Sequence, residues 1–187
     1  MPRAHRPHIW ASTPLHVKDV ISSFTRIRSP TIVATPTAFP AERGHAKKLR
    51  SSMPHTHHGA CQCGTVRFEI SGAFDCFFLC HCARCRKDTG SAHAANLFST
   101  TATITWASGQ DNITTYKVPN TRHEKSFCRT CGSAVPGLQM DGALLVVPAG
   151  SLDSAIDIRP NAHICCADRA GWDSNLQDVP SMDGLPG

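Results

Sequence analysis

The chain has 187 residues and a mass of 20.2 kDa, with 41% hydrophobic and 18% charged residues. This length can bury one hydrophobic core but hardly two, which predicts a single domain with appendages. No apolar run approaches the ~18 residues that a helix needs to span a bilayer, so the sequence argues against an integral membrane protein.

The net charge of +5 is unevenly distributed along the chain. Residues 1–52 hold nine Lys and Arg against two acidic residues, whereas the other 135 residues hold ten against twelve. The basic character therefore belongs to the N-terminal segment, and the rest of the chain is slightly acidic. For that reason we do not predict a nucleic-acid partner for the folded part.

The N-terminal segment, residues 1–56, is predicted to be a disordered leader. Residues 1–52 hold six Pro and eleven Ser or Thr, and their apolar residues follow neither helical nor strand spacing. The composition also resembles a mitochondrial transit peptide, although the prolines would interrupt the amphipathic helix that such a peptide needs. We expect a cytoplasmic protein, with mitochondrial import as the alternative.

Residues 57–187 are predicted to form one β domain. Residues 65–71 alternate, with Val66, Phe68 and Ile70 on one face and Arg67 and Glu69 on the other, as in a half-buried strand. Further strands are predicted at residues 74–82, 92–98, 101–106, 113–118, 124–127, 143–147 and 162–165. No segment repeats apolar residues at helical spacing over about twelve residues, so the predicted fold class is all-β, with helices short or absent.

All ten cysteines lie beyond residue 60, and no secretory signal sequence opens the chain, which disfavours disulfides. Seven of them form three spaced groups: Cys61-x-Cys63, Cys80-x-Cys82-x2-Cys85 and Cys128-x2-Cys131. Such spacings direct several thiolates at one ion and are typical of metal sites. Gly64 and Gly132 directly follow two of the groups, where we expect a turn with positive φ.

The seven cysteines divide into one set of four and one set of three. A structural zinc site uses four protein ligands, and Cys61, Cys63, Cys128 and Cys131 make such a set. A set of three leaves one zinc position open for water or substrate, which is typical of catalytic sites. The three-ligand set is Cys80, Cys82 and Cys85, and it is flanked in sequence by Arg84, Arg86 and Lys87, which could attract an anionic ligand.

Other interpretations of the cysteines stay open. A fourth ligand from Cys76, His81, His93, Cys165 or Cys166 would make the second zinc purely structural, and iron–sulfur ligation is a weaker option. Otherwise we expect Cys76, Cys165 and Cys166 to be small buried apolar residues, and His81 to be a side chain that merely flanks two ligands.

The cysteine motifs resemble those of the glutathione-dependent formaldehyde-activating enzyme family. The resemblance is carried by residues 59–68 (GACQCGTVRF), 80–87 (CHCARCRK), Gly90 and 127–133 (FCRTCGS), in this order and spacing. Weaker elements at residues 150–153, His163-Ile164 and Trp172 extend it across residues 57–185. Members begin a few residues before the first motif, which favours a start at Met53 over a functional leader.

The resemblance implies a small β-tent fold of stacked antiparallel sheets that carries two zinc ions. Cys61, Cys63, Cys128 and Cys131 would hold a structural zinc, and Cys80, Cys82 and Cys85 a catalytic one. The implied activity is the condensation of glutathione with formaldehyde to S-hydroxymethylglutathione, formally a carbon–sulfur lyase reaction in reverse. Residues 91–97 are less aromatic than in many members, which bears on the substrate.

The function that we predict is therefore a zinc-dependent carbon–sulfur lyase or synthase. Its partners would be small molecules, a thiol such as glutathione and an aldehyde, and the sequence predicts no oligomeric state. Ser91, His93 and His123 are candidates for an acid or base. The alternative function is a non-catalytic zinc-binding β domain that mediates macromolecular interaction, and a redox role for Cys165 and Cys166 ranks third.

Overall fold

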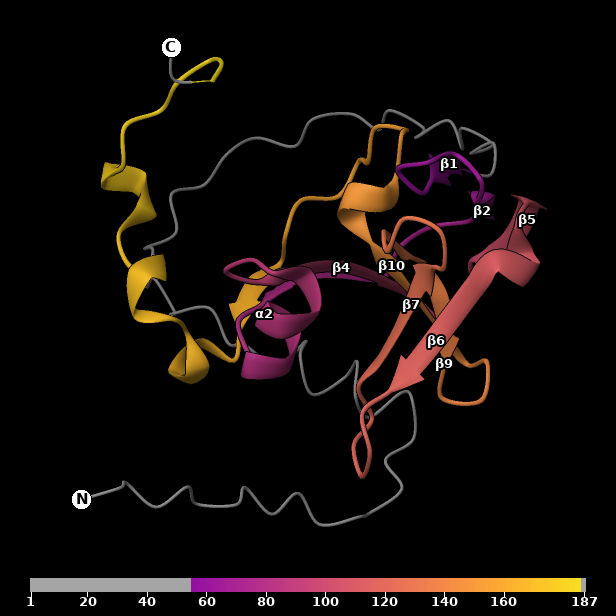
Figure 1. Ribbon diagram of the computed structural model, residues 1–187, viewed down its shortest axis with the longest axis horizontal. Helices are drawn as coiled ribbons and strands as arrows, with labels where there is room; N and C mark the ends of the chain where they lie inside the picture. Colours follow the sequence, from indigo (N-terminus) through magenta and orange to yellow (C-terminus); the bar gives the residue numbers. More distant parts are fainter. Residues whose placement is uncertain (1–54, 186–187) are drawn as a thin grey trace, which may run out of the picture. The chain divides into compact units, whose positions relative to one another are not determined.

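The structure, a computed structural model, describes residues 55–185 (Figure 1). The predicted disordered leader lies outside the described residues, except for its last two positions. The strands are β1 (Thr56–Ala60), β2 (Arg67–Ser71), β3 (Cys76–Cys80), β4 (Ala94–Ser99), β5 (Thr103–Ser108), β6 (Ile113–Lys117), β7 (Glu124–Cys128), β8 (Ala134–Val135), β9 (Gly137–Gln139), β10 (Leu144–Pro148) and β11 (Ala162–Ile164). The prediction of a mainly β protein is confirmed.

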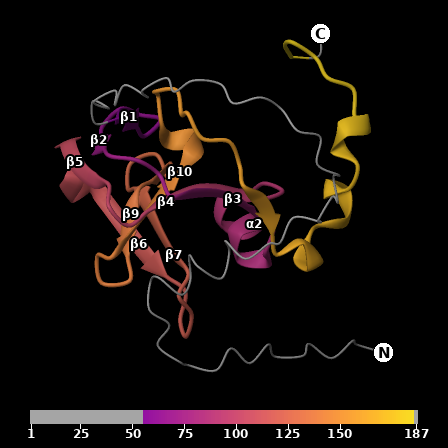
Figure 2. The ribbon, with the colours of Figure 1, turned by 180° about the vertical axis from the view of Figure 1, so that it is seen from behind.

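Helical structure is short among the described residues. The α-helix α2 spans Ala83–Thr89, and Figure 2 shows it next to β3. Single 3-10 turns are η1 (Gln110–Asn112), η2 (Ala149–Ser151), η3 (Cys166–Asp168), η4 (Gly171–Asp173) and η5 (Leu176–Asp178). None of the helices in the described part of the chain has the length and apolar character that crossing a membrane requires.

The strands form three sheets, which we name A, B and C. Sheet A has the order β1-β2-β5, sheet B the order β11-β3-β4-β10-β9, and sheet C the order β6-β7-β8. Neighbouring strands are antiparallel except for β11, which pairs in parallel with β3 and places Ile164 opposite Cys80. This pairing brings the C-terminal part of the domain to the end of β3.

The main hydrophobic core joins sheet A to sheet B. Its buried side chains are Phe68 and Ile70 of β2, Phe77 of β3, Leu97 of β4, and Leu145 and Val147 of β10. Val66, Phe68 and Ile70 are at most 2% exposed, so the predicted alternation in residues 65–71 is confirmed. β3 differs from a half-buried strand because Phe77 and Phe78 are both buried, which shows that both faces of sheet B are covered.

A second, smaller core joins sheet A to sheet C. It consists of Cys61, Val66, Cys128 and Val135, with Trp106 of β5 packed against both cores. Two of the four buried side chains in this contact are predicted metal ligands. A metal site here would therefore replace much of the apolar packing that usually joins two sheets.

No pattern in the sequence predicts β1. β1 contains no apolar alternation, and it forms because β2 supplies an antiparallel partner that places Gly59 opposite Phe68. A Cβ atom on Gly59 would lie 2.4 Å from both a Phe68 ring carbon and the Ser151 carbonyl oxygen. The strand thus packs so closely against Phe68 and Ser151 that only glycine fits at its centre.

Candidate functional site

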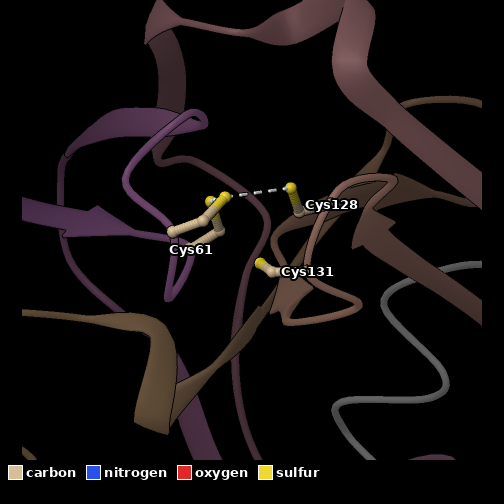
Figure 3. A group of neighbouring side chains, drawn as sticks. Cys61, Cys128 and Cys131 are labelled. Carbon is tan, nitrogen blue, oxygen red and sulfur yellow. Dashed lines mark hydrogen bonds between the residues drawn. The ribbon is translucent and has the colours of Figure 1, made fainter.

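The four cysteines of the predicted closed set lie together where sheets A and C meet. Figure 3 shows Cys61, in the segment after β1, facing Cys128 and Cys131 at the end of β7. The Sγ atoms of Cys61, Cys63, Cys128 and Cys131 all lie within 4.8 Å of one another. We call this set the four-cysteine group.

Two similar turns present these cysteines. The Gly64 N–H donates to the Cys61 carbonyl at 2.9 Å, and the Gly132 N–H donates to the Cys128 carbonyl at 2.8 Å. Both glycines have φ of 75°, so the predicted turns with positive φ are confirmed. Cys61 and Cys63 converge through this turn rather than through an extended strand.

The sulfur geometry of the four-cysteine group suits a tetrahedral ion. Cys61 Sγ lies 3.4 Å from Cys63 Sγ, which lies 3.8 Å from Cys128 Sγ. Zinc–sulfur bonds of about 2.3 Å in a tetrahedron place sulfur atoms about 3.8 Å apart. The Val66 N–H donates to Cys61 Sγ at 3.3 Å and Asn112 Nδ2 donates to Cys128 Sγ at 3.2 Å, so both buried sulfurs accept a hydrogen bond from the protein.

The exposed Cys63 and Cys131 of this group ionise more readily than the buried Cys61. The hydroxyl and backbone N–H of Ser133 lower the pKa of Cys131 to about 5, and Thr65 lowers the pKa of Cys63. Burial raises the pKa of the Cys61 thiol. A metal ion would offset that penalty, because ligation requires all four thiols to be deprotonated.

The other three predicted ligands lie where β3 passes into α2. Cys80 ends β3, Cys82 is the N-cap residue of α2, and Cys85 is the buried residue of the helix. The Cys85 N–H donates to Cys82 Sγ at 3.4 Å, so this capping hydrogen bond holds the Cys82 sulfur beside Cys85. All three Sγ atoms lie within 4.8 Å of one another, and we call them the three-cysteine group.

The thiols of the three-cysteine group share their protons unequally. A hydrogen bond from Cys85 lowers the pKa of Cys80 to about 5, with smaller contributions from Cys82 and Cys165. The same hydrogen bond raises the pKa of Cys85, together with burial and the negative charge on Cys80. Three thiolates this close repel one another, and a divalent cation would remove that repulsion.

A cavity of about 190 Å³ lies between sheets B and C and reaches the three-cysteine group. Cys80 and Cys85 line it, together with the face of sheet B opposite the main core, including Phe98 and Val146. The wall on the side of sheet C and α2 is polar and includes Asp88, Arg122, His123 and Lys125. The three-cysteine group therefore adjoins a cavity with one apolar and one charged wall.

Asp88 organises the polar wall of this cavity. Its carboxylate lies 2.8 Å from Lys125 Nζ and 3.3 Å from His123 Nε2, and Lys125 also donates to the Asp88 carbonyl. The Arg122 side chain is exposed at the same wall. The nitrogen atoms of Arg122, His123 and Lys125 thus lie at the wall of a cavity that Cys80 and Cys85 also line.

Of the three candidates for an acid or base, His123 lines this cavity. His93 stacks on His81, with ring centroids 5.1 Å apart, and burial lowers the pKa of His93. Ser91 borders a separate hollow of about 210 Å³, together with Arg86, Lys87 and Trp172. The positive side chains next to Cys85 therefore face this second hollow or solvent.

His81 is not a simple flanking residue. It is 1% exposed, its Nδ1 lies 2.6 Å from Asp173 Oδ2, and its Nε2 lies 2.8 Å from His163 Nδ1. Arg169 also reaches Asp173, with Nε 3.4 Å from the same carboxylate oxygen. Sequence spacing does not predict this cluster of His81, His163, Asp173 and Arg169, because Asp173 lies in a polar segment far from His81 in sequence.

The remaining cysteines differ from the expectation of buried apolar residues. Cys165 and Cys166 are exposed and Cys76 is half-buried, so this expectation was wrong for both members of the Cys165–Cys166 pair. The reason is that Cys165 begins a turn after β11, with φ of 56°. Within the described residues, the compact set of sulfurs contains Cys80, Cys82 and Cys85 but not Cys165.

Comparison with known proteins found a family profile and a solved structure that are similar to this chain. A crystal structure of a Rhodobacter sphaeroides protein is similar, with 23% sequence identity and a TM-score of 0.43, over 57% of this chain and 98% of that one. The family profile described as glutathione-dependent formaldehyde-activating enzyme matches residues 56–168, more than half of the chain and all three cysteine motifs. The chain therefore belongs to the glutathione-dependent formaldehyde-activating enzyme family.

Proposed function

We propose that the protein is a zinc-dependent carbon–sulfur lyase that joins a thiol to an aldehyde, with glutathione and formaldehyde as its substrates. The observation that carries the proposal is the position of the three-cysteine group at the end of the cavity, where Cys80 and Cys85 are among the lining residues. The four-cysteine group would hold a structural zinc and the three-cysteine group a catalytic one. Family membership supports the substrate pair.

The donor sets support zinc in both groups. Four thiols complete a tetrahedral zinc site, whereas three leave one position for an outside ligand. Zinc with one open position supplies a place where a thiol loses its proton near neutral pH. Soft sulfur donors without carboxylate or carbonyl ligands do not suit Mg²⁺ or Ca²⁺.

The cavity walls suit a small aldehyde and a thiol arm. Its volume of about 190 Å³ is below the roughly 300–1,000 Å³ of sites that enclose a drug-sized ligand. The apolar wall excludes water from the reacting carbon, and the exposed Arg122 can attract a carboxylate of glutathione. The tripeptide would extend from the cavity toward Arg122, with only its cysteine arm inside.

His123 is positioned to move the proton of the reaction. Addition forms a bond between the thiol sulfur and the aldehyde carbon, breaks the S–H bond and the C=O π bond, and moves the thiol proton to the carbonyl oxygen. Asp88 holds the His123 ring at the cavity wall at 3.3 Å, so the ring can take the proton from the thiol and give it to the oxygen, and can carry it back when the C–S bond breaks. Cys80, Cys82 and Cys85 hold the ion, and the cavity holds two reactants together, which supplies much of the rate gain.

All ten cysteines are free thiols, which supports a reducing compartment, and we place the reaction in the cytoplasm. Glutathione is a thiol of such compartments.

The test replaces the three-cysteine group as a unit. In zinc-loaded protein we expect two equivalents of zinc and faster exchange between glutathione, formaldehyde and their adduct, measured by NMR exchange spectroscopy. The triple variant Cys80→Ser, Cys82→Ser, Cys85→Ser should keep one zinc and its β fold but lose the acceleration. Cys76→Ser, a cysteine of β3 outside both groups, is the matched control. Acceleration by the triple variant, or two zinc ions in it, would contradict the proposal.

A further inference from the structure

We propose that Asn96 is a further catalytic residue, whose side-chain amide donates a hydrogen bond to the oxygen of the aldehyde while the C–S bond forms. This inference rests on the proposed function and names the group that recognises that oxygen. Asn96 lies in β4 and belongs to neither cysteine group. The direction of its side chain, its place beside Cys80 and the state of its amide support this role.

The alternation of side chains along β4 directs Asn96 into the cavity between sheets B and C. Leu97 is buried in the main core, and Ala95 packs against the same core. Because successive side chains of a strand point to opposite faces, Asn96 and Phe98 lie on the other face of sheet B. Both line the cavity of about 190 Å³ that Cys80 also lines. The half-buried Asn96 amide is therefore a polar group on the apolar wall.

The pairing of β3 with β4 places Asn96 next to the three-cysteine group. Cys80 of β3 lies opposite Ala94 of β4, two residues before Asn96. Residues directly opposite share a face, as do residues two positions apart, so Cys80 and Asn96 are diagonal neighbours on the cavity face. Such neighbours lie about 7–8 Å apart in an antiparallel pair. This spacing leaves room for a carbonyl group between the amide and a substrate sulfur at the three-cysteine group.

The Asn96 amide is also available for a ligand. Its side chain has no hydrogen-bond partner in the part of the chain that the structure describes, whereas the other polar side chains of the cavity, apart from the exposed Arg122, are held by ion pairs or hydrogen bonds. The side chains held in this way are Asp88, His123, Glu124, Lys125, Ser126 and Gln139. Inside the cavity, the Asn96 amide is thus the group whose donors await a partner.

The proposed reaction calls for a donor at this position. As the sulfur bonds to the aldehyde carbon, the π electrons of the C=O bond move to the oxygen, which carries negative charge until His123 delivers the thiol proton. An amide N–H that donates to this oxygen keeps its own proton, and its hydrogen bond strengthens as the charge grows. The contact therefore lowers the barrier more than it tightens binding of the aldehyde. His123 would move the proton, and Asn96 would hold the oxygen.

The experiment compares Asn96→Leu with the wild type, both full-length and zinc-loaded. Leucine has nearly the same shape as asparagine but no donor, so kcat for formation of the adduct should fall about a hundredfold, measured by NMR exchange spectroscopy. Two equivalents of zinc should remain. Gln110→Leu replaces an exposed amide of η1 that does not line the cavity, and this control should keep the wild-type kcat.

A binding measurement separates recognition of the oxygen from activity. S-ethylglutathione carries a methyl group where S-hydroxymethylglutathione carries its hydroxyl, and both are thioethers. In NMR titrations, with a slight excess of formaldehyde to keep the adduct formed, the wild type should bind the hydroxyl compound about tenfold more tightly. Asn96→Leu should bind both compounds with similar affinity.

Each other outcome counts against the role of Asn96. An unchanged kcat in Asn96→Leu, or a preference for the hydroxyl compound that persists in this variant, would overturn the inference and leave the proposed function standing. Loss of a zinc equivalent from the variant would show that Asn96 supports the metal group instead, which also overturns it. A wild-type protein that neither accelerates the exchange nor prefers the hydroxyl compound would remove the proposed function, and this inference with it.

Discussion

His81 separates two predicted metal ligands in sequence but is the most deeply buried polar side chain of this region. Its ring packs against those of His93 and His163, with centroids 5.1 and 5.0 Å away, and its Nδ1 faces Asp173. The ring thereby ties the Cys80–Cys82 segment to the C-terminal part of the domain. We therefore expect the position of Cys80 and Cys82 to depend on His81.

Replacing Asp173 tests this anchor. Asp173→Ala leaves His81 Nδ1 buried without its partner at 2.6 Å, so we expect the free energy of unfolding to fall by about 1–3 kcal/mol. Urea unfolding of the zinc-loaded protein measures the change. Asp178→Ala, an exposed aspartate of η5, is the control and should have little effect. Equal unfolding midpoints for the two variants would show that the His81–Asp173 contact adds no stability.

Replacing His123 tests its proposed proton transfer. His123→Gln keeps a polar side chain of similar reach at the cavity wall but cannot exchange a proton, so kcat should fall about a hundredfold. The zinc content should stay at two equivalents, because His123 belongs to neither cysteine group. His58→Gln, an exposed histidine of β1, is the control. An unchanged kcat would exclude His123 as the acid or base.

At the scale of elements, most strands could be predicted because their burial follows the sequence pattern. The alternation of residues 65–71 predicts β2, and its apolar face is the face that packs in the main core. β1 could not be predicted, since Gly59 and its neighbours carry no such pattern and the strand depends on contacts with Phe68 and Ser151. β1 forms through its pairing with β2 and its contact with Ser151.

The helix α2 could not be predicted for a different reason. It has seven residues, and Cys85 is its one buried side chain, so no helical repeat of apolar residues announces it. The local signals were a capping residue at Cys82 and a C-terminal glycine, Gly90, with φ of 64°. Glycine is a common signal for the end of a helix, whereas cysteine is not among the residues that commonly cap a helix start, so the sequence does not predict α2. Here the same residue caps the helix and presents a sulfur.

Part of the candidate site, its groups of cysteines, could be predicted from local spacing, whereas the cavity could not. The spacing within each motif fixed which cysteines converge, because ligands two or three residues apart need only a local turn. The cavity could not be predicted, since Asp88, His123 and Phe98 come from α2, the segment before β7 and β4. The position of Ile164 beside Cys80 depends likewise on the parallel pairing of β11, which no local pattern reveals.

At the scale of the whole domain, the two cysteine groups have unequal structural weight. Cys61 and Cys128 are themselves buried in the core that joins sheets A and C. The three-cysteine group, in contrast, is built from one continuous stretch of chain between β3 and α2. A metal in the first group would connect two sheets, whereas a metal in the second would order only a short segment.

Single replacements in the two groups should therefore destabilise the protein unequally. Cys131→Ser removes an exposed ligand of the four-cysteine group without opening a cavity in the core, and Cys82→Ser removes a partly exposed ligand of the other group. Because binding energy at a structural zinc is folding energy, we expect Cys131→Ser to lower the Tm by about 10 °C or more. Cys82→Ser should lower it by roughly half as much or less, since its metal holds only local structure. Thermal unfolding followed by near-ultraviolet circular dichroism, together with zinc analysis of each variant, measures both effects. A larger loss for Cys82→Ser would reverse the assignment of structural and catalytic roles, since the group that joins the sheets would then contribute less to the fold than the group at the cavity.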